Sequence, residues 1–408
     1  MDLIETKFLK LAADNAPGQE TRLRAQGDRR DANMLKGEAL SGVPVDFSHG
    51  DVDAFLPTPG AQDAFNAGFN SGGQQAYTEY RGSGTIRQAL ASRLAAFTGR
   101  PITDGDRLII TPGTQGALFL AIASVVTAGD KVAIVQPDYF ANRKIVQFLD
   151  AQMVPVRLQY ADNNDKAGLD LNELESAFKD GVKLFVFSNP NNPAGVIYSD
   201  DEIREIGNLA NRYGVTVIVD QLYSRLLYDG RTYTHLRAGE MDPEKTITIM
   251  GPSKTESLSG YRLGVAFGAL PIIDRMEKLQ AIVSLRAAGY NQAVLNTWFA
   301  EPEGWMADRI AKHQAIRDDL ISILRSVNGV TVRSPEAGSY LFPALPKLSV
   351  TPMEFVGILR KQALVTVTIG TEFSPHHENS VRLNFSQNHQ AAVDAVERMT
   401  KLIERYRA

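Results

Sequence analysis

Apolar residues gather in seven short runs between residues 107 and 268, and polar or helix-patterned stretches separate most of these runs. The runs cover residues 107–112, 131–137, 153–159, 183–190, 215–221, 246–251 and 263–268. Runs this continuous are typical of strands buried on both faces, as in a parallel sheet with helices on either side. The pattern therefore predicts an α/β fold whose large domain is built on a mostly parallel, seven-stranded sheet.

The chain on either side of this region has a different pattern. It begins with an amphipathic helical stretch and then becomes polar and rich in arginine, which indicates an arm that packs against another part of the protein. Towards the C-terminus, amphipathic helices and strands alternate at shorter range, as in an α+β domain. We therefore expect an arm with part of a small domain over residues 1–51, a large domain over 52–290 and a small α+β domain over 291–408. The cleft between two such domains is a common place for a ligand.

Composition narrows the classes of function. The 408 residues carry a formal net charge of -4, whereas binding to a phosphate backbone requires a basic excess, so no nucleic-acid partner is expected. The absence of cysteine excludes disulfides, thiolate catalysis and Cys-ligated metals, and the His376–His377 pair supplies too few ligands to predict a metal site. No apolar run approaches the roughly 20 residues that cross a bilayer, and the N-terminus lacks a secretory pattern. We expect a cytoplasmic protein without a membrane partner.

The clearest chemical signal lies in residues 246–268, where two β-rich runs flank a Gly- and Ser-rich connection that contains Lys254 and Arg262. A lysine packed beside apolar strands and near another cation is more often present as the free amine, which can attack a carbonyl. In a parallel sheet, ligands collect at the carboxyl ends of the strands. Polar residues at the ends of the other predicted strands are therefore candidate partners of Lys254.

Two such candidates follow the first two runs. Gly113, Thr114 and Gln115 form a turn that opens an apolar helix, where free N–H groups and the helix dipole favour a bound anion. Tyr139 follows the second run and offers a flat aromatic face. Each signal alone is also compatible with a structural role, as a simple turn or as a packing tyrosine.

Three further candidates lie later in the chain. Asn192 belongs to a turn in which two Asn-Pro steps fix the backbone and aim an amide side chain. Asp220 closes a run of β-branched residues, where burial is costly unless the acid meets a cation or a donor. Arg382 lies inside an apolar strand of the C-terminal region. For Asp220 and Arg382, the structural alternative is an ion pair within the protein.

Together these groups answer one chemical need. A lysine nucleophile, an acid, an anion cradle, a stacking ring and a carboxylate-binding arginine are what pyridoxal phosphate chemistry requires. Lys254 would hold the cofactor as a Schiff base and, as the free amine, would move the proton between the substrate Cα and the cofactor carbon. Asp220 would keep the pyridine nitrogen protonated. The phosphate would be held by Arg262, Ser253 and the turn at 113–115.

The chain resembles the class I/II aminotransferases, which are pyridoxal-phosphate enzymes of fold type I, over nearly its whole length. The resemblance rests on S-K-x5-G-x-R-x-G at residues 253–264, NPNNPAG at 189–195 and D-x-x-Y at 220–223, in this order and spacing. The long arginine-rich arm, Pro252 before the Ser-Lys pair and Gln221 after the aspartate depart from the usual pattern. None of these departures removes a catalytic group, and together they leave the subfamily open.

The resemblance implies roles for individual residues. Asn192 and Tyr223 would contact the cofactor 3-hydroxyl, and Arg382 with Asn192 would bind the substrate, the arginine at its α-carboxylate. Tyr223 would then join Lys254 and Asp220 as a catalytic residue.

Three further residues enter by the same resemblance. Tyr139 would stack on the cofactor ring. Tyr77 matches a tyrosine that reaches a phosphate across a subunit interface, which implies an obligate homodimer with shared active sites. Gly50 would lie near the substrate carboxylate, and its neighbour His49 could face the substrate or serve a structural role.

These observations predict transfer of an amino group from an α-amino acid to a 2-oxo acid by a ping-pong mechanism. Another pyridoxal-phosphate reaction on an α-amino acid, such as β- or γ-elimination, decarboxylation, cyclisation or oxidation, stays open because all of them share one carbanion. A pyridoxal-phosphate-binding regulatory module is a remote alternative, since a basic DNA-binding domain has little room before the α/β region. No second arginine marks a dicarboxylate substrate, so aspartate specificity is not predicted.

Overall fold

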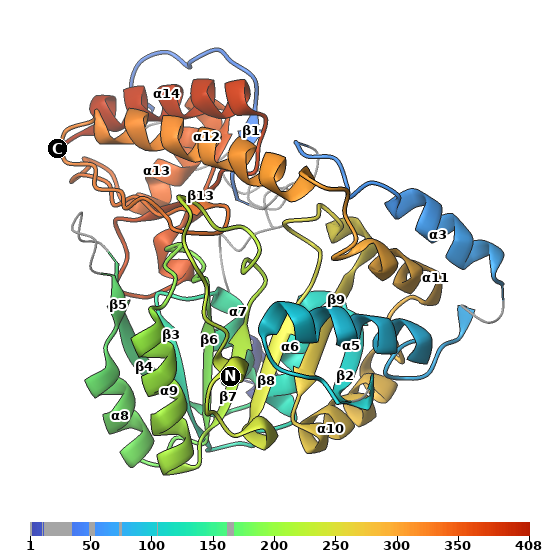
Figure 1. Ribbon diagram of the computed structural model, residues 1–408. Helices are drawn as coiled ribbons and strands as arrows, with labels where there is room; N and C mark the ends of the chain where they lie inside the picture. Colours follow the sequence, from blue (N-terminus) through green and yellow to red (C-terminus); the bar gives the residue numbers. More distant parts are fainter. Residues whose placement is uncertain are drawn as a thin grey trace.

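The structure is a computed structural model that describes residues 2–9, 11, 35–48, 54–72, 76–103, 105–160 and 167–408. A large unit carries an eight-stranded sheet with helices on both faces, and a smaller unit of helices and short strands lies above it (Figure 1). The expected α/β class with an additional α+β part is confirmed. The division at residues 52 and 291 stays a prediction.

The large sheet has the strand order β2-β9-β8-β7-β6-β3-β4-β5. Its strands are β2 (Leu108–Pro112), β3 (Lys131–Gln136), β4 (Gln152–Gln159), β5 (Gly168–Leu169), β6 (Leu184–Ser188), β7 (Thr216–Asp220), β8 (Thr246–Met250) and β9 (Leu263–Gly268). Neighbours from β8 to β4 pair in parallel, whereas β9 is antiparallel to β2 and β8. All seven predicted strands are present. The additional strand is the two-residue β5, which pairs antiparallel with the end of β4.

Helices cover both faces of this sheet because alternate strand residues point to opposite sides. In β6, Phe185 and Phe187 pack with α8 (Leu171–Lys179) and α9 (Asp200–Tyr213). Leu184 and Val186 point the other way and pack in a core that includes α6 (Gly113–Ala123), α7 (Phe140–Phe148) and α10 (Leu270–Val283). All four side chains are fully buried, and burial of one such side chain stabilises by about 1.5–3 kcal/mol. None of the helices in the described ranges combines the length and apolarity that a bilayer crossing needs.

The edge of the sheet at β2 and β9 has its own cover. There α5 (Gly84–Thr98) packs in a core with both strands and with Leu295 and Trp298. Two short helices, α3 (Ala61–Asn70) and α11 (Gly289–Gln292), contact each other at this side of the molecule (Figure 1). The chain after residue 291 thus still packs on the large sheet before it enters the small unit.

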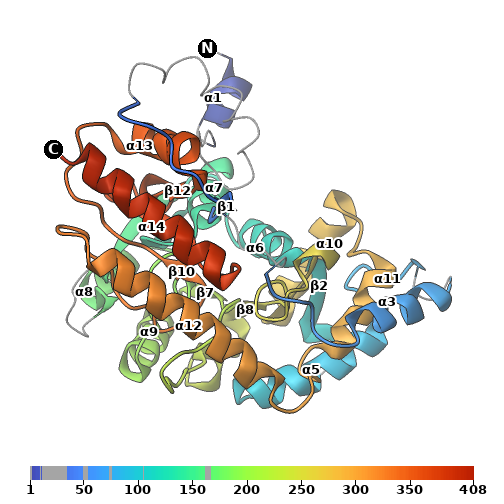
Figure 2. The ribbon, with the colours of Figure 1, turned by 90° about the horizontal axis from the view of Figure 1, so that it is seen from above.

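The small unit is held together by a core of its own. It contains the strands β1 (Val45–Asp46), β10 (Tyr340–Leu341), β11 (Val365–Thr366), β12 (Thr368–Ile369) and β13 (Val381–Asn384), and the helices α12 (Trp305–Arg325), α13 (Pro352–Ile358) and α14 (His389–Tyr406). The two long helices α12 and α14 lie side by side (Figure 2). Because β1 pairs with β11, residues 45–46 contribute to this unit.

The start of the arm packs on the large unit. Helix α1 (Leu3–Leu9) places the ammonium group of Lys7 over the Phe148 ring, 4.4 Å from its centroid, and 3.9 Å from an Asp150 carboxylate oxygen. This is the packing role expected for the amphipathic start of the chain. The arginines of the arm fall within residues 12–34, outside the described residues.

Candidate active site

The predicted site residues converge on one cavity of about 250 Å³ between the strand ends of the large sheet and the small unit. Ten of them line it: Thr114, Gln115, Tyr139, Asn192, Asp220, Tyr223, Ser253, Lys254, Arg262 and Arg382. Gly113 is not in the lining but lies directly against Arg262. Tyr77 is also absent from the lining, and Gly50, with His49, falls outside the described residues.

Strand register explains why residues so distant in sequence meet here. Ser188 at the end of β6 is level with Asp220 at the end of β7, and Asp220 is level with Ile249 of β8. Three neighbouring parallel strands therefore end at the same height, and the segments that follow them share one edge. This places Asn192, Asp220 and Lys254 around a single space, as the strand-end argument predicted.

Two glycines allow the Lys254 segment to approach the helix that bears the anion cradle. A β-carbon at Gly264 would lie 2.3 Å from the Thr114 nitrogen, and one at Gly251 would lie 2.8 Å from the Thr114 side chain. Real β-carbons do not approach other atoms this closely, so β9 and the start of α6 pack together only without side chains at these positions. The glycine that closes the S-K-x5-G-x-R-x-G motif is thus explained by packing.

The first turn of α6 lies beside Arg262, where the sequence predicted an anion cradle. Gly113 opens the helix with a φ of +75°, and a β-carbon there would lie 2.5 Å from Arg262 Nη2. Arg262 itself has a left-handed backbone and donates from Nη1 to the Ser259 carbonyl at 2.8 Å. Free N–H groups at a helix start and a guanidinium beside them suit a phosphate.

Asp220 lies deep in the cavity wall, only 9% exposed. Burial raises its pKa to about 6, although one carboxylate oxygen accepts a hydrogen bond from the Leu222 amide at 3.0 Å. The structural alternative for this residue is an ion pair, and Asp220 forms none with any residue that the structure describes. An unpaired buried carboxylate is costly, and a cationic N–H on a bound ligand would offset that cost.

Arg382 is the second unpaired charge of the site. It is 2% exposed and donates from Nη2 to the Ser48 carbonyl at 2.6 Å and from Nη1 to the Asn192 amide oxygen at 3.2 Å. Its buried Nε has no acceptor within the described part of the chain, and its guanidinium lies over the Tyr340 ring, 4.2 Å from the centroid. No carboxylate of the described chain pairs with it. A buried guanidinium with a free N–H is ready to bind a carboxylate from outside the protein.

Tyr340 is a site residue that the sequence argument missed. Its hydroxyl accepts a hydrogen bond from the Tyr223 hydroxyl at 2.7 Å, and it lines the cavity with Lys254. Burial raises the pKa of Tyr340, but the positive charges of Lys254 and Arg382 and the bond from Tyr223 outweigh burial and leave it below its usual value. Burial raises the pKa of Tyr223 well above its usual value. No signal in the sequence points to this contact, which the fold makes possible at Gly338, where a φ of +79° brings the backbone against the Tyr223 ring.

A second group that the sequence prediction missed, Asp138, holds the backbone of Tyr139. The Asp138 carboxylate accepts hydrogen bonds from the amides of Tyr139 and Ser188, at 2.6 Å and 3.0 Å, and from the Ser188 hydroxyl. The Ser188 hydroxyl accepts in turn from the Asn192 amide at 3.1 Å. Burial raises the Asp138 pKa to about 8 despite these donors. One buried carboxyl thus fixes the backbone that bears both Tyr139 and Asn192.

The charges of the cavity fit a ligand with two anionic groups. The lining contains three cationic side chains, Lys254, Arg262 and Arg382, and one carboxylate, Asp220. A phosphate at the cradle, a carboxylate at Arg382 and a protonated ring nitrogen at Asp220 would neutralise all but the lysine. The residues present therefore fit pyridoxal phosphate together with an amino acid.

Comparison with known proteins adds independent findings. The family model described as aminotransferase class I and II matches residues 45–398. An aspartate aminotransferase from Sulfolobus acidocaldarius is 28% identical, over 94% of this chain and 95% of that protein. The crystal structure of an aspartate aminotransferase from Rhodobacter sphaeroides 2.4.1 is 65% identical, covers 99% of this chain and 100% of that one, and superposes with a TM-score of 0.94.

The fold and the site define a transaminase of the pyridoxal-phosphate type. The chain belongs to the aminotransferase class I and II family. Enzymes of this family use pyridoxal phosphate, and they act on amino acids and oxo acids. Among the reactions that the sequence left open, family membership selects amino transfer.

Proposed function

We propose that this transaminase moves an amino group from an α-amino acid to a 2-oxo acid in two half-reactions, with pyridoxal 5'-phosphate held at Lys254. One observation supports this most. Lys254, Asp220 and Arg382 line one cavity, and none of them forms an ion pair with a described residue. Unpaired charges of both signs around one space are expected of a site whose charges are neutralised by a bound ligand.

Arg382 would bind the α-carboxylate of the substrate. Its Nη1 is positioned by Asn192 and its Nη2 by the Ser48 carbonyl, while its buried Nε stays free. The contact with the Tyr340 ring holds the guanidinium plane. Because a guanidinium and a carboxylate match in a planar, bidentate geometry, this arrangement selects substrates with an α-carboxylate and orients the Cα–H bond.

Proton transfer would fall to Lys254. When bound, the cofactor supplies a protonated ring that withdraws electrons from the substrate Cα. The Lys254 side-chain nitrogen, which has no hydrogen-bond or ion-pair partner among the described residues, would take the proton from the substrate Cα as the free amine and return it to the cofactor carbon. Asp220 would accept a hydrogen bond from the N–H of the cofactor ring nitrogen, and Tyr139 would hold the cofactor ring by stacking.

The test of this proposal is the loss of cofactor and activity on replacement of Lys254. Lys254→Ala should lose the visible absorption of the purified protein and at least about 10³-fold of its amino-transfer activity, because the proton carrier is gone. Lys401→Ala, at an exposed position on α14, is the matched control and should retain both. An unchanged spectrum and activity in Lys254→Ala would overturn the assignment.

Aspartate is the first amino donor to test, because relatives of this chain are named aspartate aminotransferases. The described lining offers Arg382 for the α-carboxylate and Arg262 beside the cradle, and no third arginine for a side-chain carboxylate. A panel of aspartate, alanine and phenylalanine with a fixed 2-oxo acid decides the question through the 2-oxo acid released. A kcat/KM for alanine above that for aspartate would exclude aspartate as the preferred donor.

A homodimer with shared active sites is supported by the surface that bears Tyr77. Tyr77 does not line the cavity of its own chain and is 69% exposed, and the Arg286 guanidinium lies 3.5 Å from its ring centroid. Tyr77 shares a surface hollow with Glu277 of α10, and Ile282 and Val283 at the end of that helix are 80% and 60% exposed. Large exposed apolar side chains that lie together on a surface are typical of a protein–protein interface. If a second copy of the chain bound to this surface, Tyr77 of one copy would lie towards the cofactor phosphate held by the other copy.

Molar mass in solution tests this interface. Ile282→Asp combined with Val283→Asp should shift the protein from dimer to monomer. Tyr77→Phe should leave the dimer intact and weaken cofactor affinity about tenfold, because one hydrogen bond to a charged phosphate is lost. A monomeric native protein would refute the proposal. The expectation of a cytoplasmic protein without nucleic-acid or membrane partners stays a prediction.

A further inference from the structure

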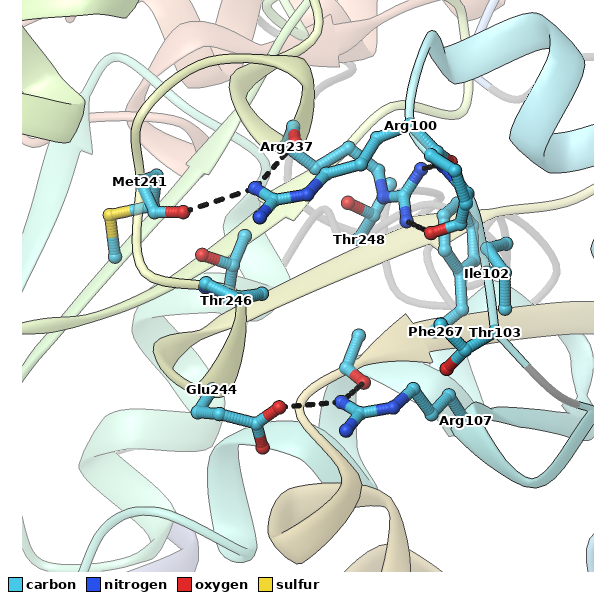
Figure 3. A pocket seen from close by; sticks show the side chains of 13 residues that line it. Arg100, Ile102, Thr103, Arg107, Arg237, Met241, Glu244, Thr246, Thr248 and Phe267 are labelled. Atoms are coloured by element: carbon cyan, nitrogen blue, oxygen red, sulfur yellow. Dashed lines mark hydrogen bonds and ion pairs between the residues drawn. The ribbon is translucent and has the colours of Figure 1, made fainter.

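Figure 3 shows a second cavity, of about 210 Å³. It lies at the opposite end of β8 from Lys254. Its wall contains Thr246 and Thr248 at the start of β8, the end of β9, and the segments around Arg100 and Arg237. Lys254 follows the far end of β8, so none of the residues discussed for the active site takes part in this wall. Nothing in the amino-transfer reaction accounts for the cavity.

Two arginines in this wall carry positive charge that the described chain does not neutralise. Arg237 donates from Nη1 to the Thr98 hydroxyl and the Arg100 carbonyl, both at 2.6 Å, and from Nη2 to the Pro101 carbonyl at 3.2 Å. Arg100 donates from Nη1 to the Arg237 carbonyl at 3.2 Å and, more weakly, to the Met241 carbonyl at 3.4 Å. All of these acceptors are neutral.

The two guanidinium groups therefore brace each other's backbone without forming an ion pair within the described ranges (Figure 3). Burial and the nearby charge of Arg100 lower the pKa of Arg237 to about 10, so it stays cationic at neutral pH. The third arginine, Arg107, is paired with Glu244 at 2.6 Å. The excess positive charge thus lies on Arg100 and Arg237.

One buried hydroxyl in the same wall has no partner among the described residues. Thr248 is 1% exposed, and its Oγ1 forms no hydrogen bond with any of them. Thr246, two residues earlier on the same face of β8, donates its hydroxyl to the Asp242 carbonyl at 2.9 Å. A buried hydroxyl is normally satisfied, so the free Thr248 hydroxyl beside two unneutralised guanidinium groups indicates a missing acceptor.

We propose that this cavity binds a small carboxylate with a compact apolar body. The carboxylate oxygens accept from Arg100, Arg237 and the Thr248 hydroxyl. The apolar body packs on Ile102 and Phe267, which lie in the same wall. A planar anion suits two guanidinium groups. A carboxylate is favoured over inorganic phosphate because much of the remaining wall is apolar and offers few further donors for a third charged oxygen.

Calorimetric titration of the cofactor-loaded protein with benzoate tests this proposal. Benzoate also reaches Arg382 in the active site, so two classes of site are expected in the native protein. Thr248→Val should weaken one class about tenfold and leave the other unchanged. Arg100→Gln should weaken the same class further. Benzamide, which has the same shape without the charge, should not bind to this class.

Folding controls accompany the titration. Thr248→Val should not lower the melting temperature, because the hydroxyl that it removes has no partner. Thr246→Val, which removes a bonded hydroxyl, should lower the melting temperature and leave benzoate affinity unchanged. The proposal would be overturned if the native protein had a single class of benzoate site whose affinity stayed unchanged in Thr248→Val and in Arg100→Gln. Equal binding of benzamide, or inorganic phosphate that binds this class more tightly than benzoate, would also overturn it.

Discussion

Two groups of buried charged side chains lie close to the segment that carries Lys254, and they differ in how their charges are compensated. In the active-site cavity, Arg382 and Asp220 have no charged partner among the described residues. In the neighbouring cluster, Arg225 donates to Glu301 at 2.8 Å and 3.0 Å and also to Glu256, and all three side chains are at most 12% exposed. The charges of the cluster are neutralised within the protein, whereas those of the cavity would be neutralised only by a bound ligand.

From this difference we infer that the cluster stabilises the fold and that the cavity binds a ligand. Glu256 lies two residues after Lys254, and its backbone carbonyl accepts from the Thr58 amide at 3.0 Å. The cluster therefore fixes the segment from which Lys254 projects. Replacement of one charged group or one hydroxyl at a time shows whether stability or catalysis depends on it.

The largest effect on stability is expected from Arg225→Gln. It leaves Glu256 and Glu301 buried together without their cation, and loss of one partner of a buried ion pair costs about 3–5 kcal/mol. Urea unfolding should show this loss in the free energy of unfolding, while the KM for the amino acid changes little in the folded protein. Unchanged stability would mean that the cluster is not the structural counterpart of the cavity.

The opposite outcome is expected for Arg382→Gln. The kcat/KM for the amino acid should fall about 10²-fold, mainly through KM, because hydrogen bonds between charged groups are lost. The melting temperature should stay the same or rise, because an unneutralised buried cation is removed. A large fall in melting temperature with an unchanged KM would place Arg382 among the structural arginines.

A pH effect of intermediate size should come from Glu256. Burial raises the pKa of its carboxyl to about 7 from an ordinary 4.5, against the opposing charge of Arg225 and with support from Glu301. Because the folded protein binds this proton more tightly than the unfolded chain, Glu256 favours folding most at low pH. Its contribution declines as the pH rises from about 4.5 to 7.

The comparison of native protein with Glu256→Gln isolates this contribution from those of Asp138 and Asp220, whose pKa values burial also raises. Between pH 5 and pH 8, the native protein should lose on the order of 1–3 kcal/mol more unfolding free energy than the variant. Parallel pH curves for the two proteins would contradict the assignment.

The sequence predicted the parts of this molecule that depend on local pattern. The seven strands are runs of apolar residues. Asp220 is the last residue of β7, and Asn192 and Lys254 follow the ends of β6 and β8. The strands and these three site residues could therefore be inferred from their order along the chain. The two-residue strand β5 has no such pattern and was missed. The free state of Arg382 was also unreadable, since an arginine in an apolar strand is equally compatible with an ion pair.

Contacts between distant segments account for the remaining gaps. Tyr340 meets Tyr223 across 117 residues, and the Ser48 carbonyl meets Arg382 across 334 residues. Neither residue type nor spacing signals such a meeting. The position of Tyr77 outside the cavity lining was likewise visible only in the folded chain, and the role implied for Tyr77 would require a second copy of the chain.

The smallest effect is expected from Tyr340→Phe, which tests whether a hydroxyl inside the cavity acts on catalysis or only on packing. The ring that supports Arg382 remains, so KM should change little, while the buried Tyr223 hydroxyl loses its partner at 2.7 Å. Loss of one such bond corresponds to about 1 kcal/mol, which predicts a fall in kcat of roughly fivefold. Tyr213→Phe is the matched control, because its hydroxyl bonds to Glu175 at 2.9 Å outside the cavity, and it should leave kcat unchanged. If Tyr340→Phe instead lowers stability without changing kcat, the tyrosine pair belongs with the paired cluster, and only the unpaired charges of the cavity serve catalysis.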